Sequence, residues 1–172
     1  MRVSRQVSLL VIVALVLGLV TTAQVWQTRA AMMSMKMSTT LSGSEETPPD
    51  SSRATGSYQG TVASNNRTIS YRLTFSKLSA KATAAHIHAG AKGVAGPVVV
   101  WFCGGGGRKA CPANGGTVTG FINPANVLAG GDVKQGDLGS LIKAIQAGNT
   151  YVNVHSTKYP GGEIRGQIQG GM

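Results

Sequence analysis

The sequence predicts an all-β domain: a β-sandwich of about 7–8 short strands with Greek-key connections and one short helix. Three observations support this prediction. Segments that alternate apolar and polar residues recur along the chain, separated by turn signals about every 8–12 residues. Glycine is abundant, with 24 residues, whereas aromatic residues make up only 5% of the chain. Apolar residues at helical spacing are confined to one short segment.

The first 30 residues have the pattern of a signal peptide. Arg2 and Arg5 precede an apolar run from Leu9 to Val20. That run suits the apolar core of a signal peptide but is too short to span a bilayer. Small residues allow cleavage after Ala23 or after Ala30. We therefore expect a secreted, periplasmic or cell-surface protein, and an uncleaved N-terminal anchor is the alternative that would bring it to a membrane.

A flexible methionine-rich lead-in is expected at residues 31–37, followed by the β-sandwich domain at 38–172. The lead-in contains Met32, Met33, Met35 and Met37. Thioether ligands favour Cu(I). A copper-binding segment and a leader without any ligand are the two interpretations of this cluster.

Alternation places the strands along the chain. The clearest strand is 68–76, in which Ile69, Tyr71, Leu73 and Phe75 share one face. A short strand at 41–43 precedes a double-proline turn, and Asn65-Asn66 marks a hairpin-type turn. Further strands are expected at 56–63, 81–89, 97–102, 117–122, 151–155 and 164–168.

One helix is expected after Asp137, which is suited to cap it. Its apolar residues are Leu138, Leu141, Ile142 and Ile145, at the spacing of one helix face. Gly148 stands where a glycine commonly ends a helix. We expect this helix to bridge the two sheets.

The formal net charge is +10, with only six acidic residues. A basic exported protein is expected to contact an anionic polymer or another protein at the cell surface, and simple solubility is the other explanation. The lysines are scattered, without a basic helix or interleaved aromatic residues. Nucleic acid is therefore not an expected partner.

Cys103 and Cys111 are the only cysteines. In an exported chain, an isolated pair predicts a disulfide, here around a glycine-rich loop. A metal role is less favoured because this spacing matches no common zinc motif.

All three histidines fall in two predicted strands. His86 and His88 point to the same side of their strand, and His155 shares a face with Asn153 in the other. After the Pro-Gly-Gly turn, Glu163 and Arg165 are expected on the polar face, opposite Ile164 and Ile168. If these strands are neighbours, the imidazoles gather on one polar sheet face.

One interpretation of this cluster is a metal site for copper or zinc. Its ligands would be His86, His88 and His155, with Glu163 as a fourth ligand or as a hydrogen-bond partner of a ligand. Asn153 and Arg165 are the other residues expected to contact the ligands and orient them without binding the metal. The alternative is a polar cluster without metal, in which the histidines bond to backbone carbonyls of the 90–96 and 156–162 loops.

The sequence does not favour an enzyme. It lacks a Gly-x-Ser-x-Gly nucleophile motif, the Lys-Ser/Thr ending of a phosphate-binding loop and paired carboxylates. A metal-dependent redox activity is the alternative, and no cofactor other than copper or zinc is expected.

The sequence resembles the chordin-type (CHRD) domain from about residue 37 to 169. The matching motifs are LSG with ETPP at 41–49, AHIHAG with GPVV at 85–99, and YVNVH with PGGEIRGQ at 151–167. The resemblance implies an exported, immunoglobulin-like β-sandwich without a settled activity, which favours a non-catalytic binding or structural module.

A weaker likeness to copper–zinc superoxide dismutase rests on the His-x-His strand, the distant histidine and the disulfide-tethered loop. That enzyme needs about twice as many histidines, so dismutation is not expected. A site for a single metal ion remains open.

Overall fold

The computed structural model describes residues 34–171. The expected signal peptide, both of its cleavage sites, Met32 and Met33 lie outside these residues. None of the helices within 34–171 combines the length and the apolar composition that crossing a membrane requires.

The described chain forms nine strands, one α-helix and two short 3-10 helices. The strands are β1 (Lys36–Ser42), β2 (Thr55–Val62), β3 (Ile69–Ser76), β4 (Ala82–Ala89), β5 (Val98–Cys103), β6 (Gly115–Ile122), β7 (Thr150–Ser156), β8 (Ile164–Gln167) and β9 (Gln169–Gly171). The helices are η1 (Gly43–Glu45), η2 (Pro124–Asn126) and α2 (Leu138–Gln146).

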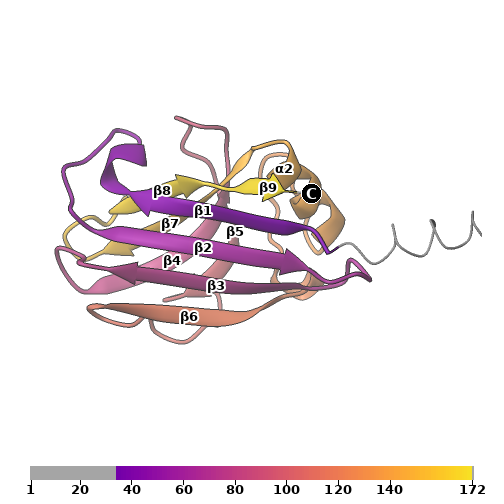
Figure 1. The fold of residues 1–172 in the computed structure, drawn as a ribbon, viewed down its shortest axis with the longest axis horizontal. Coiled ribbons are helices and arrows are strands. Elements are labelled where there is room, and N and C mark those ends of the chain that lie inside the picture. Colours follow the sequence, from indigo (N-terminus) through magenta and orange to yellow (C-terminus); the bar gives the residue numbers. More distant parts are fainter. Residues whose placement is uncertain (1–33, 172) are drawn as a thin grey trace, which may run out of the picture. The chain divides into compact units, whose positions relative to one another are not determined.

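All strand pairs are antiparallel, and they run in the order β5-β4-β7-β8-β1-β2-β3-β6, with β9 beside β1. The sheet folds over itself, so that β1, β2, β3 and β6 form one layer and β4, β5 and β7 lie behind it (Figure 1). The β3–β4 and β5–β6 connections cross between these layers. The all-β prediction is confirmed, with one helix as expected.

The core lies between the two layers and follows the alternation of the strands. Tyr58, Leu73, Ile87, Val152 and Ile164 are fully buried, each from a different strand. The sequence neighbours of Tyr58 and Leu73 lie on the opposite, exposed or half-buried face, as the two-residue period of a strand requires. Those of Val152 lie on the opposite face too, but Tyr151 and Asn153 are buried there as well. This alternation also turns both histidines of β4 away from the core.

The prediction of a flexible lead-in through residue 37 is wrong at its end. Strand β1 begins at Lys36, and Met37 is 3% exposed. Its sulfur accepts a hydrogen bond from the hydroxyl of Tyr58 at 3.7 Å, and β1 pairs with both β2 and β9. Met37 is therefore a core residue, and the domain starts before residue 38, the beginning expected from the sequence.

The helix prediction is confirmed in its bounds and its caps. The side chain of Asp137 accepts a hydrogen bond from the backbone N–H of Ser140 at 3.1 Å. Gly148 follows the helix with φ of 70°, a left-handed conformation that suits glycine.

The disulfide between Cys103 and Cys111 is also confirmed. It closes the loop at the end of β5, and both cysteines are buried. A side chain added at Gly105 or Gly106 would overlap the indole of Trp101. Glycine at these positions lets the loop backbone lie directly on Trp101.

Candidate metal centre

The two histidine-bearing strands are neighbours in the sheet. In the pairing of β4 with β7, Ala84 lies opposite His155, His86 opposite Asn153 and His88 opposite Tyr151. The three imidazoles therefore belong to one patch of the outer sheet face, as the alternation pattern predicted.

The histidine nitrogens lie close enough to share one ion. One ring nitrogen from each of His86, His88 and His155 falls within 4.8 Å of the others. Nδ1 of His86 is 3.1 Å from Nε2 of His155. Two nitrogens bound to one tetrahedral ion at about 2.0–2.1 Å are separated by roughly 3.3 Å. The His86–His155 pair thus already has the spacing of two ligands.

Backbone carbonyls fix the tautomers of two of these rings. Nδ1 of His88 donates to the Gly96 oxygen at 2.8 Å, and Nδ1 of His155 donates to the Pro160 oxygen at 3.0 Å. A carbonyl oxygen can only accept, so Nδ1 carries the proton in each neutral ring. Nε2 of His88 is then left with a free lone pair, and Nε2 of His155 uses its lone pair to accept the hydrogen bond from Nδ1 of His86. A ring nitrogen without a proton is the form that binds a metal.

Burial keeps all three rings neutral near pH 7 because it lowers the pKa of each one. Burial lowers the pKa of His86 to about 3, helped by the neighbouring His155 and His88. Burial also lowers the pKa of His88 to about 4, against the opposing hydrogen bond to Gly96. The pKa of His155 is lowered for the same main reason, despite its bond to Pro160.

Aromatic rings enclose the cluster on two sides. The Trp101 indole meets the His86 ring edge-on, with centroids 4.1 Å apart. Tyr151 stacks on His88, with centroids 4.8 Å apart and planes only 6° from parallel. These contacts restrict the rotation of both rings on β4, which keeps their nitrogens directed at the cluster.

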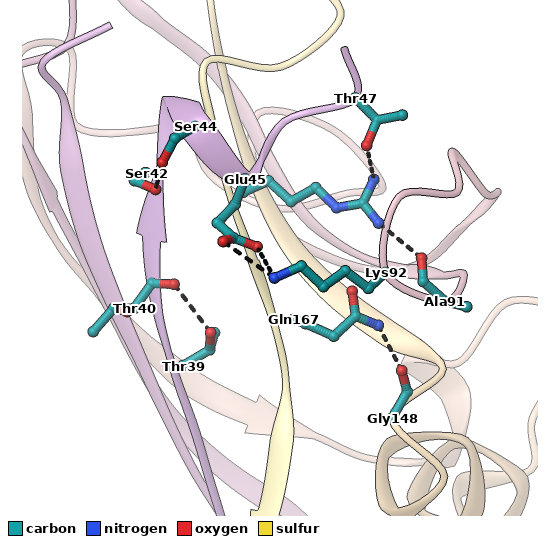
Figure 2. A network of polar contacts seen from close by, with 11 residues as sticks. Thr39, Thr40, Ser42, Ser44, Glu45, Thr47, Ala91, Lys92, Gly148 and Gln167 are labelled. Carbon is teal, nitrogen blue, oxygen red and sulfur yellow. Dashed lines mark hydrogen bonds and ion pairs between the residues drawn. The ribbon is translucent and has the colours of Figure 1, made fainter. Parts of the chain in front are cut away.

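Arg165 supports the site through Tyr151 and a loop. Its guanidinium lies 3.4 Å from the centre of the Tyr151 ring. It donates to the carbonyls of Ala91 and Val94 and to the Thr47 hydroxyl; the contacts with Thr47 and Ala91 are drawn in Figure 2. Arg165 thus holds the loop whose Gly96 carbonyl accepts the hydrogen bond from His88, but Arg165 itself bonds to no histidine.

Asn153 lies within the patch but is bonded elsewhere. Its Nδ2 donates to Oε1 of Glu46 at 2.7 Å. Burial raises the pKa of Glu46 to about 7, partly offset by this hydrogen bond and reinforced by the charge of Asp50. The carbonyl oxygen of Asn153 is buried without a protein partner. Asn153 thus connects the patch to Glu46 and is not a partner of a histidine.

Glu163 does not join the histidines, in contrast to the sequence expectation. It is fully buried, and its carboxylate accepts from the Ser52 hydroxyl at 2.7 Å and the Ser79 N–H at 2.6 Å. Burial would raise its pKa, but hydrogen bonds from Ser156, Ser79 and Ser52 lower it. The alternation of β8 begins only at Ile164, and Gly162 has φ of 134°. This backbone turn directs Glu163 away from the position that alternation assigned to it.

The arrangement provides three neutral imidazole donors and no thiolate or carboxylate. Among residues 34–171, these histidines are the only group of three or more His, Cys, Asp or Glu side chains whose ligand atoms are close enough to share one ion. Such a donor set suits Zn(II) and copper. The carbonyls of Gly96 and Pro160 lie in the 90–96 and 156–162 loops, where the interpretation without metal expected the histidines to find acceptors. Trp101 was missed from the sequence, since it belongs to no recognisable ligand motif.

A comparison with family models matches residues 37–168 to the CHRD domain. No match was found among the curated proteins or among the solved structures. The matched segment contains all of β1 except its first residue, and all of β2 through β8, and with them all three histidines.

Proposed function

Because the chain belongs to the CHRD domain family and gathers its only histidines on one sheet face, we propose that it is an exported, non-catalytic module that binds a single copper or zinc ion. His86, His88 and His155 are the ligands. Asn153, Arg165 and Glu163 lie outside the set of ligands.

The observation that carries this proposal is the pattern of used and unused ring nitrogens. A cluster held only by hydrogen bonds explains the Nδ1 contacts of His88 and His155. It does not explain why Nε2 of His88 is buried without a protein partner. Leaving a buried acceptor unpaired costs about 1–3 kcal/mol. A metal ion would use this lone pair and would replace the hydrogen bond between Nδ1 of His86 and Nε2 of His155.

The choice between zinc and copper follows from the donor set. Imidazole is a ligand of both ions, and three protein ligands leave a further coordination position for a water molecule or another small ligand. The absence of a thioether or thiolate from the cluster favours Cu(II) over Cu(I) as the copper form. Zinc and Cu(II) are therefore the two ions to compare.

Export is supported by the disulfide. Cys103 and Cys111 form a buried cross-link, and such bonds persist mainly in oxidising compartments. The same compartments are where an exported protein meets extracellular zinc and Cu(II).

Metal analysis tests this proposal. The mature, tag-free chain is dialysed against Zn(II) or Cu(II), and its bound metal is compared with that of a His86→Ala/His88→Ala double variant. The control is Ser57→Ala/Gln59→Ala, which changes two exposed residues at the same spacing on β2, in the other layer. We expect one ion per chain in the wild type and control, and none in the histidine variant. Equal metal in all three proteins, or none in the wild type, would contradict the proposal.

A further inference from the structure

A surface cavity of about 440 Å³ lies beside the disulfide-closed loop. Among its lining residues, Lys81 directly precedes β4, Thr83 is the second residue of β4, and Thr157 follows the end of β7. Arg108, within the loop, lines the same cavity. No carboxylate is among the residues that line it. The cavity therefore combines two permanent positive charges with two hydroxyl groups.

The loop that carries Arg108 has a fixed shape. Its ends are joined through Cys103 and Cys111. The Gly104 N–H donates to the Lys109 carbonyl at 2.9 Å, and the Arg108 N–H donates to the Gly105 carbonyl at 3.0 Å. A side chain at Gly104 would overlap the Thr83 carbonyl, so only glycine lets the loop lie against β4. Arg108 is thus presented by a closed loop seated on the sheet and not by a free surface segment.

The guanidinium of Arg108 has an unused donor. Its Nη2 is buried without any hydrogen-bond acceptor from the protein, and the half-buried side chain meets the cavity through its remaining exposed surface. Arginine remains charged at all physiological pH values, and a buried donor of a charged group is costly to leave unpaired. Oxyanions such as carboxylate and sulfate are the acceptors that best match its planar set of donors.

The surrounding charge favours an anion at this place. Lys109 adds an exposed cation on the same loop. Within residues 34–171, the structure contains a single ion pair, between Lys92 and Glu45 (Figure 2). The basic residues at the cavity are therefore not neutralised by the protein's own carboxylates.

We propose that this cavity is an anion-binding site that takes a sulfate or carboxylate group of an acidic polysaccharide. Arg108 and Lys81 bind the anionic group, and Thr83 and Thr157 are within the same cavity to donate hydrogen bonds. The site uses no histidine and is independent of the metal site. The net charge of +10 attracts an anionic polymer to the protein as a whole, and this cavity is the specific place where the polymer binds.

The first test uses the wild-type protein and inorganic sulfate. The ¹⁵N-labelled mature chain is titrated with sodium sulfate at constant ionic strength, and amide shifts are followed by NMR. We expect saturable shifts confined to the 104–110 loop and to residues 81–83 and 157. Shifts that are absent, or that spread over all basic surfaces, would overturn the proposal, and this result does not depend on any variant folding.

The second test uses heparin as the polysaccharide probe. Lys81→Gln/Arg108→Gln is compared with Arg67→Gln/Lys143→Gln, which removes the same charge from exposed positions in the β2–β3 hairpin and in α2. We expect the cavity variant to bind heparin about tenfold more weakly than the control and to elute at lower salt. Equal weakening would assign retention to general charge and overturn the site. Sulfate binding without heparin retention would overturn the polysaccharide assignment.

Discussion

Nδ1 of His86 lies 3.1 Å from Nε2 of His155, although 69 positions separate the two residues in the sequence. The pairing of β4 with β7 brings them together, because it sets Ala84 opposite His155 and His86 two residues further along the same face. Because Nδ1 of His155 donates to the Pro160 carbonyl, its Nε2 accepts the hydrogen bond from Nδ1 of His86, and the same lone pair can bind a metal ion instead. This contact is the structural basis of the proposed metal centre.

Gly96→Ala should weaken metal binding although residue 96 is not a ligand. A Cβ at this position would overlap the Ala89 carbonyl, so the loop must move and His88 loses the acceptor of its Nδ1 proton. Partners of metal-bound histidines are typically worth about 10–100-fold in affinity. Isothermal titration with Zn(II) measures this change.

The control for that variant is Gly161→Ala in the loop of the other acceptor. A Cβ at Gly161 meets no atom within 4 Å, so the affinity should stay at the wild-type value. Equal affinities for all three proteins would show that the carbonyl of Gly96 does not orient His88.

Glu163→Gln should lower stability without changing metal uptake. The buried carboxylate accepts from Ser52 and Ser79, and an amide in its place points a donor at one of these groups. We expect a loss of about 1–3 kcal/mol in the free energy of unfolding, measured with urea. A large loss of bound zinc in the folded variant would return Glu163 to the metal site.

Removal of the disulfide should destabilise the domain measurably. For the Cys103→Ser/Cys111→Ser variant, closure of so short a loop predicts a loss of roughly 2–3 kcal/mol in the free energy of unfolding. Urea denaturation of the oxidised wild type and of the cysteine-free variant gives this difference. Unchanged stability would mean that the 104–110 loop is held by its backbone contacts alone.

Glu46 should make stability decrease as the pH rises. Its pKa is raised from 4.5 to about 7, mainly by burial, with the Asp50 charge adding to the rise and the Arg165 charge opposing it. The folded state therefore holds this proton more tightly than the unfolded state does. The resulting stabilisation is complete below pH 4.5 and is lost as the pH rises through about 7.

Glu46→Gln tests this dependence, because glutamine keeps an oxygen acceptor for Asn153 and cannot ionise. Melting temperatures are compared from about pH 5 to about pH 8, where the wild type should lose stability relative to Glu46→Gln. Glu45→Gln, which changes the adjacent carboxylate, is the control and should keep the wild-type trend. A constant difference between wild type and Glu46→Gln across this range would contradict the assigned shift.

The sequence was sufficient for those features that depend on local periodicity. Alternation placed His86 and His88 on one face, and the Asp137 and Gly148 signals marked both ends of the helix. The convergence of His155 on this pair required the assumption that two distant strands are neighbours. Strand pairing of that kind depends on packing of the whole sheet and has no local signal.

Two expectations failed because an irregular backbone interrupts the pattern. Gly162, with φ of 134°, breaks the alternation just before β8, and Glu163 turns to the Ser52 and Ser79 donors. Met37 belonged to a methionine cluster in sequence but enters the core because β1 extends to Lys36. The sequence indicated the 90–96 and 156–162 loops as the source of carbonyl acceptors, but not which residue of each loop accepts, because every residue carries that group.

The most direct test of the metal centre is ¹⁵N NMR of the histidine rings during a Zn(II) titration. Without metal, His88 and His155 should be neutral at pH 7 with the proton on Nδ1. On titration, Nε2 of both rings should shift and reach saturation at one zinc per chain, while the Nδ1 protons are retained. A proton on Nε2 in either ring, or nitrogen shifts that do not change with zinc, would contradict the proposed site.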